Sequence, residues 1–201
     1  MVTRDRLIET SIDLFSQYGF DGTSLSSIAE KAGVTQPTLN YHFGTKEQLY
    51  RDVIRHCGRQ WVAAVEVGAD LRDLSRADVL KVALRRLGYV IVGQKVETRL
   101  MMQASMHPGF EDEVEEALGP GVKTLTLLLE DLMAEGYLRK VPPHVFISMF
   151  VDVLTTSAGM ERVKSSVYGV DFSDESFVNA QIDDLIDILL NGTRVHRSDD
   201  G

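Results

Sequence analysis

The sequence is poor in the residues that hold disulfide-rich or metal-dependent domains together. Among its 201 residues there is one cysteine, Cys57, which excludes a disulfide within the chain. The five histidines are scattered and have no cysteine partners, so we expect neither a structural metal nor a cofactor. No apolar run approaches the roughly 18 residues of a membrane span. The first ten residues, MVTRDRLIET, lack the apolar core of an export signal, so we expect a cytoplasmic protein without membrane contact.

Catalytic motifs are missing too. The stretch GPGVKT at residues 119–124 ends like a phosphate-binding loop, but it lacks the glycine that such a loop needs and follows no strand. We find no nucleophile elbow, paired-histidine zinc helix or dinucleotide fingerprint. Asp183, Asp184 and Asp187 are spaced so that they share the polar face of a helix, which favours a solvated surface over a cation site. We therefore expect no catalytic residues and no enzyme.

Negative charge is in excess, but only in one part of the chain. The net charge is −9, whereas residues 1–60 hold seven Lys or Arg and seven Asp or Glu. All of the excess lies in residues 61–201. A neutral N-terminal part (the head, residues 1–60) and an acidic remainder (the body, residues 61–201) suit a protein that contacts DNA through its head alone. The DNA phosphates would repel the acidic body.

Residues 25–46, LSSIAEKAGVTQPTLNYHFGTK, contain two short amphipathic runs separated by a tight turn. Gly33 supplies the permissive backbone that ends the first helix. Pro37 stands in the first turn of the second helix, where a missing amide is tolerated, and Leu39 and Phe43 face inward four residues apart. This pattern predicts a helix-turn-helix, although a helical hairpin with a polar outer face also occurs in ordinary helical proteins.

The outward residues of this hairpin are rich in groups that hydrogen-bond base edges or phosphate oxygens. Gln and Asn side chains suit adenine, and a lysine at the next helix start suits phosphate. The residues that we expect to contact DNA are Thr23, Ser24, Thr35, Gln36, Pro37, Thr38, Asn40, Tyr41, His42 and Lys46.

The flanking sequence adds one helix on each side of the hairpin. An apolar stripe from about Thr3 predicts a helix that Gly19 ends. Thr45, with Gln48 three residues later, predicts the capped start of a further helix. That helix carries apolar residues as far as Val65, so it is long enough to leave the head and enter a second domain.

With these elements in place, residues 3–50 resemble the TetR family of one-component bacterial transcription regulators. The resemblance is carried by the LFSQYGFDGTSLSSIAEKAGV run, the TLNYHF segment and the lysine of FGTKEQLY, in the family's order and spacing. Many relatives carry tyrosine where this chain has Asn40. The resemblance implies a helical body with a ligand cavity behind the DNA-binding head.

The rest of the chain shows helical patterns and no strand-like alternation. We expect helices over residues 75–93, 97–106, 111–117, 122–135, about 143–166 and from 175 onward, with a break at GPG, residues 119–121. The fold class is therefore all-α: a three-helix N-terminal helix-turn-helix domain and a larger helical ligand-binding and dimerisation domain, nine or ten helices in total. The predicted boundaries are 1–48 and 49–201.

Two functional surfaces are expected in this larger domain. Flexible methionines suit a pocket for varied apolar shapes, although a role in the core is the commoner one for them. The pocket candidates are Trp61, Met101, Met102, Gln103, Met106, Phe146, Phe150 and Leu154. The last two helices are apolar around more than half of their circumference, which favours a subunit interface over a purely internal core. The interface candidates are Val153, Met160, Val178, Ile182, Leu185, Ile186 and Leu189.

Together these features predict a ligand-responsive transcriptional regulator. We expect a homodimeric repressor that binds palindromic double-stranded DNA and is released by a small, largely apolar effector. Two alternatives stay open at this point: a helix-turn-helix module that binds another protein, and a helical enzyme with an appended DNA-binding head. The absence of a catalytic constellation disfavours the enzyme.

Overall fold

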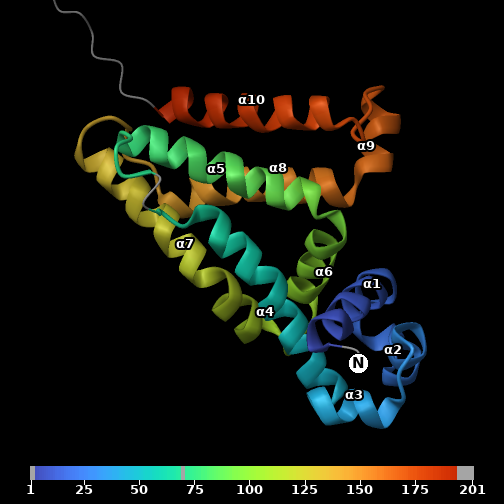
Figure 1. The fold of residues 1–201 in the computed structure, drawn as a ribbon. Helices are drawn as coiled ribbons and strands as arrows, with labels where there is room; N and C mark the ends of the chain where they lie inside the picture. The colour runs from blue at the N-terminus through green and yellow to red at the C-terminus, as the bar shows by residue number, and fades with distance from the viewer. Residues whose placement is uncertain (1–2, 69–70, 194–201) are drawn as a thin grey trace, which may run out of the picture. The chain divides into compact units, whose positions relative to one another are not determined.

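A computed structural model of the chain describes residues 3–68 and 71–193 (Figure 1). In these ranges the chain forms ten helices and no strand, which confirms the all-α fold class. None of the described helices is both long and apolar enough to cross a membrane. The helices are α1 (Arg4–Gly22), α2 (Leu25–Ala32), α3 (Gln36–Phe43), α4 (Lys46–Val65), α5 (Arg76–Gly93), α6 (Lys95–Met106), α7 (Glu111–Ala134), α8 (Pro143–Gly159), α9 (Glu161–Tyr168) and α10 (Glu175–Thr193).

The chain divides into two compact units that are not continuous in sequence. Unit 1 comprises residues 1–60 and 94–118, and unit 2 comprises residues 61–93 and 119–201. Helices α4 and α7 each begin in unit 1 and end in unit 2. These units are defined by packing, whereas the predicted domains were defined by function. The predicted domain boundary at residue 48 therefore stays a prediction. The terminal residues of the two predicted domains, 1–2 and 194–201, lie outside the described residues.

Local signals in the sequence fix the ends of the helices in unit 1. The hydroxyl of Ser24 accepts the amide of Ser27 at 3.0 Å, and Gly33 ends α2 with φ 69°. Gly19 interrupts the helical backbone of α1 with φ 72°, as predicted, and one further turn leads to Gly22. At the start of α4, the predicted cap is confirmed because the Gln48 amide donates to the Thr45 hydroxyl at 3.1 Å.

The core of unit 1 contains an aromatic cluster around Tyr50, a fully buried residue of α4. Its ring packs against Phe15, Phe20 and Phe110 with centroid separations of 4.7 to 5.2 Å. Burial raises the pKa of the Tyr50 phenol to about 12. The same helix buries Cys57, whose thiol pKa is also raised to about 12, chiefly by burial. This core joins α1, α4 and the α6–α7 turn into one packed body.

Helix α7 differs from the prediction of a break at residues 119–121. It runs unbroken from Glu111 to Ala134 through Pro120, and neither neighbouring glycine has a positive φ. An interior proline typically costs about 3 kcal/mol of helix stability. Packing offsets that cost within unit 2, because a Cβ at Gly121 would lie only 3.3 Å from Val65. The prediction of two helices was therefore wrong.

In unit 2, α5, α8 and α10 pack on one another (Figure 1). Helices α5 and α10 approach closely at Gly88, where a Cβ would meet the Ile182 side chain at 2.8 Å. The single helix predicted over residues 143–166 was wrong. Helix α8 ends at Gly159, and Met160 has φ −116° and ψ 23°, outside helical values, before α9 begins.

Candidate nucleic-acid interface

The second helix of the hairpin, α3, presents the predicted outward face. Its inward residues, Leu39 and Phe43, are buried in the core of unit 1. The side chains of Gln36, Thr38 and Asn40 are exposed. Tyr41 is 87% exposed, so both its ring and its hydroxyl are available to a partner. The helix thus offers neutral hydrogen-bond donors and acceptors with an aromatic ring beside them.

The other predicted contacts are distributed around this face. Ser24 and Thr35 are exposed N-cap residues whose hydroxyls accept backbone amides, Thr35 from Thr38 at 3.4 Å. Pro37 is exposed, and His42 is half-buried. Each of these residues is accessible to a ligand on the outer side of α2 and α3.

Thr23 is placed differently from the prediction. It is 3% exposed, and its hydroxyl donates within unit 1 to the carbonyl oxygens of Gly19 at 2.8 Å and Leu14 at 3.2 Å. The side chain therefore fastens the turn between α1 and α2. We exclude it from the proposed DNA contacts because its hydrogen-bonding group faces the protein interior.

Lys46 also serves the fold. Its Nζ donates to the carbonyl oxygens of Phe20 at 2.9 Å and Thr23 at 3.1 Å, and lies 4.2 Å from the Phe20 ring centroid. Sequence reasoning gave Lys46 a phosphate contact alone and missed this role. An ammonium group has three N–H donors, so one donor of Lys46 remains for a phosphate contact.

The structural role of Lys46 can be measured. Lys46→Met keeps the apolar stem but removes the donors from two carbonyl oxygens, so we expect a loss of about 1 to 2 kcal/mol in the free energy of unfolding. Urea denaturation followed by circular dichroism measures it. The matched control is Lys31→Met, because Lys31 only makes an exposed pair with Asp13 and should change stability by less than about 0.5 kcal/mol. Equal small effects would assign Lys46 no role in the fold.

Most other basic residues of unit 1 near the hairpin already have acidic partners. Arg4 pairs with Asp52 at 2.6 Å, and Arg55 pairs with the same carboxylate at 3.1 Å. Arg51 pairs with Glu113 at the start of α7. Because acidic side chains lie close to these charges, we expect release of counterions to contribute less to DNA affinity than hydrogen bonds from α3.

The predicted pocket residues fall into both units. Met101 is buried in the core of unit 1, Met106 is 73% exposed, and Gln103 donates from its amide to the Ser16 carbonyl oxygen at 3.1 Å. Met102, also on α6, is half-buried. The other candidates belong to unit 2 and are buried: Trp61, Phe146, Phe150 and Leu154. No pocket within a single unit contains the whole set.

The predicted interface residues separate by exposure. On α10, apolar residues are already buried within the chain: Val178, Ile182, Ile186 and Leu189. They form part of the core of unit 2, so they are not free to contact another subunit. Val153 on α8 is 39% exposed, Met160 is 46% exposed, and Leu185 is half-buried. These three remain candidates for an interface.

Comparison with known proteins places these features in a family. The family model described as "Bacterial regulatory proteins, tetR family" matches residues 7–53, which cover most of α1, all of α2 and α3 and the first turns of α4. The chain is 28% identical over 190 residues to the HTH-type transcriptional regulator RutR of Escherichia coli K12, a match that covers 94% of this chain and 89% of RutR. Over 54 residues it is 37% identical to IcaR of Staphylococcus epidermidis, the HTH-type negative transcriptional regulator of the biofilm operon icaADBC. That match covers 27% of this chain and 29% of IcaR.

Solved structures share the fold over nearly the whole chain. The transcriptional regulator FadR from Bacillus subtilis, in complex with stearoyl-CoA, superposes with a TM-score of 0.75 at 14% identity, covering 96% of this chain and all of that one. PfmR from Thermus thermophilus, a TetR family transcriptional regulator, gives a TM-score of 0.72 at 20% identity, covering 98% and 100%. At these identities the likeness concerns the fold alone.

A helix-turn-helix with an exposed polar face, at the head of an all-helical chain whose relatives regulate transcription, defines a DNA-binding transcriptional regulator. More narrowly, residues 7–53 match the TetR family of bacterial transcriptional regulators, and the chain shares its fold with a solved TetR family regulator.

Proposed function

We propose that the protein is a repressor that binds a palindromic operator as a homodimer in the cytoplasm and releases it when a small molecule binds the helical body. The observation that carries this proposal is the exposed surface of α3, which presents the polar side chains of Gln36, Thr38 and Asn40 together with the exposed ring of Tyr41. Repression is the role that the name of IcaR gives that relative, and the FadR structure holds an acyl-CoA. Both support the proposal by similarity.

Sequence-specific reading should depend on Asn40, whose amide group suits the N6 and N7 edge of adenine. Asn40→Ala should weaken the preferred operator by about 1 to 3 kcal/mol and relax the preference at one position of each half-site. Gel shifts with operators varied base by base measure both effects. Ser26→Ala, at another exposed position, is the matched control and should leave the preference unchanged. Uniform weakening on every operator would make Asn40 a backbone contact.

Dimerisation would give the two α3 helices the spacing that a palindrome requires. Paired recognition helices read half-sites about 34 to 36 Å apart, one turn of DNA. The exposed apolar residues Val153 and Met160, with Leu185 on α10, support a face for the second copy. A two-fold axis through this face makes the contact self-complementary.

Release by an effector predicts a reciprocal coupling. If the effector weakens operator binding by a given factor, the operator must weaken effector binding by the same factor, typically about 5- to 150-fold. Isothermal titration calorimetry of each ligand in the absence and presence of the other tests this. A gel shift with DNA that flanks the gene supplies the operator, and also separates this function from a protein-binding module. Independent binding of operator and effector would remove the effector from the proposal and leave a constitutive DNA-binding protein.

A further inference from the structure

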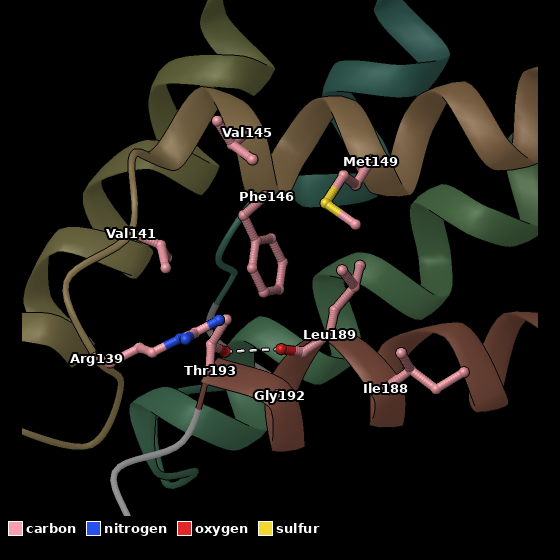
Figure 2. A pocket seen from close by; sticks show the side chains of 9 residues that line it. All are labelled: Arg139, Val141, Val145, Phe146, Met149, Ile188, Leu189, Gly192 and Thr193. Atoms are coloured by element: carbon pink, nitrogen blue, oxygen red, sulfur yellow. Dashed lines mark hydrogen bonds between the residues drawn. The ribbon is translucent and has the colours of Figure 1, made fainter.

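A small pocket opens on unit 2 between the start of α8 and the end of α10 (Figure 2). Its volume is about 200 Å³. The rim is apolar and exposed within the single chain, because Val145, Met149 and Ile188 are 41%, 52% and 68% exposed. Phe146 and Leu189 are buried and form the inner wall. Contiguous exposed apolar surface is typical of a site that another molecule covers.

The polar groups of Thr193, which lines the pocket, are paired within the protein. Its hydroxyl donates to the Leu189 carbonyl oxygen at 2.7 Å, drawn as a dashed line in Figure 2. Its carbonyl oxygen accepts the backbone amide of Arg139 at 2.6 Å. These bonds leave mainly apolar surface, which favours an apolar occupant. A cavity of about 150 Å³ in an engineered lysozyme accepts benzene, so the pocket is large enough for one or two aliphatic side chains.

Helix α9 presents apolar side chains that its own chain leaves exposed. None of its eight residues, all of them within the described part of the chain, is buried. Val163 and Val167 lie four residues apart on one side of α9 and are 54% and 70% exposed, and Met160 just before the helix is 46% exposed. The Lys164 ammonium donates to the Ser157 hydroxyl of α8 at 2.8 Å, so a polar contact holds α9 to its own chain. A helix this short is marginal in water unless it packs against a partner.

Helix α9 and the pocket lie at opposite ends of the pair formed by α8 and α10 (Figure 1). The chain order requires this, because α9 links the end of α8 to the start of α10, whereas the pocket joins the start of α8 to the end of α10. Val153, the exposed interface candidate on α8, lies between the two ends. Along the helix it is about 12 Å from Val145 and about 10 Å from Met160.

A two-fold axis at Val153 brings α9 of one copy over the pocket of the other. Such an axis pairs the two α8 helices antiparallel in a self-complementary contact. With Val153 opposite its own copy, Val145 lies opposite the junction of α8 and α9 in the other copy, at Met160. The same contact occurs twice, once at each end of the interface. Each pocket therefore meets an exposed apolar segment of the other copy.

Charge favours the same arrangement. Residues 139–145, at the pocket end, hold two Lys or Arg and no acidic residue. Residues 160–175, at the α9 end, hold four Asp or Glu and two Lys or Arg. Antiparallel pairing sets the basic end of each copy against the acidic end of the other, which is electrostatically complementary.

We propose that Met160 and Val163 of one subunit fill the apolar pocket between α8 and α10 of its partner, at both ends of a two-fold interface. The occupant of the pocket is thus a second copy of this chain. This assignment rests on the homodimer of the proposed function and adds the register of the two copies. In the dimer the rim residues Val145, Met149 and Ile188 are covered by α9 of the other subunit.

The test joins the two surfaces by a disulfide in the full-length protein. Met149→Cys combined with Val163→Cys places one thiol at the pocket rim and one on α9. Within one chain these positions are separated by about 15 Å of α8, beyond the limit of about 7 Å between the Cα atoms of a disulfide. After mild oxidation we expect about tenfold more covalent dimer on non-reducing gels than from either single variant. Native Cys57 does not interfere, because it is buried and its thiol pKa is raised to about 12.

The matched control combines Met149→Cys with Val122→Cys. Val122 on α7 is 45% exposed, similar to the 54% of Val163, but lies outside α8, α9 and α10. This pair should give no more covalent dimer than the single variants. An independent measurement needs no cysteine: Val163→Asp should weaken dimerisation by about tenfold or more in analytical ultracentrifugation, because it places a carboxylate in an apolar pocket. Val122→Asp should leave dimerisation unchanged.

The outcome for this register is separable from that for the proposed function. Absence of the cross-link in a protein that ultracentrifugation shows to be dimeric would overturn the register and leave the homodimer in place. A monomeric protein would overturn both. The other candidate occupant is the end of the same chain, residues 194–201, which hold one apolar side chain, Val195. A cross-link that appears only when Val195→Asp is added would assign the pocket to those residues instead, whereas an unchanged yield supports the second copy.

Discussion

Val153→Glu should convert the protein to a monomer and reduce operator affinity by about a hundredfold or more. By two-fold symmetry the substitution places two carboxylates in one apolar contact, where neither is paired, and burying an unpaired charge is strongly unfavourable. A monomer then binds one half-site at a time, without the gain in effective concentration that the linked second head provides. Analytical ultracentrifugation gives the oligomeric state, and gel shifts with whole and half operators give the affinity.

Val122→Glu is the matched control for this experiment. Val122 is a valine of α7 with 45% exposure, close to the 39% of Val153, and it lies outside α8 and α10. It should leave both the oligomeric state and the operator affinity within about twofold of the unmodified protein. A dimeric Val153→Glu protein would show that the interface does not use this part of α8.

Phe15→Ala should destabilise unit 1 by about 3 to 5 kcal/mol. Phe15 is fully buried and packs edge-on against Tyr50 with the ring centroids 4.7 Å apart, so its removal leaves a cavity in the aromatic cluster. Whole domains are stable by only about 5 to 15 kcal/mol. Much of the DNA-binding head should therefore be unfolded near physiological temperature, and operator binding should fall with it.

The two units give separate signals in this experiment. The single tryptophan, Trp61, lies in unit 2, so its fluorescence reports that unit, while circular dichroism reports both. Urea titration should move the circular dichroism transition toward lower urea. Tyr18→Ala on the same helix, at a side chain that is 56% exposed, should change stability by less than about 0.5 kcal/mol. A loss below about 1 kcal/mol in Phe15→Ala would mean that the cluster repacks around the smaller residue.

The features that sequence predicted well are those set by a few neighbouring residues. The αL backbone of Gly33 and the Thr45 cap each depend on groups within four residues. The inward positions of α3 follow in the same way, because Leu39 and Phe43 are four residues apart on one face. Such signals act before any tertiary structure exists, so they can be recognised in a sequence alone.

The features that sequence missed depend on distant packing partners. Pro120 predicts a break, yet α7 continues, because Gly121 packs beside a valine of α4 more than fifty residues earlier. The apolar stripe on α10 does not reveal whether it packs against the same chain or against another subunit. In the structure, Ile182 of this stripe packs on Gly88 of α5. The small pocket between the start of α8 and the end of α10 (Figure 2) requires these two helices to meet, which no local sequence pattern can predict.

The burial of Cys57 makes this regulator a convenient subject for site-directed spectroscopy. Its thiol has no solvent exposure and a pKa of about 12, so almost none of it is the reactive thiolate at neutral pH. A nitroxide or fluorophore that reacts with thiols will therefore attach only to a cysteine introduced at the surface. Placed at Tyr41, such a label would report the distance between the two α3 helices of the proposed dimer in solution without removing the native cysteine.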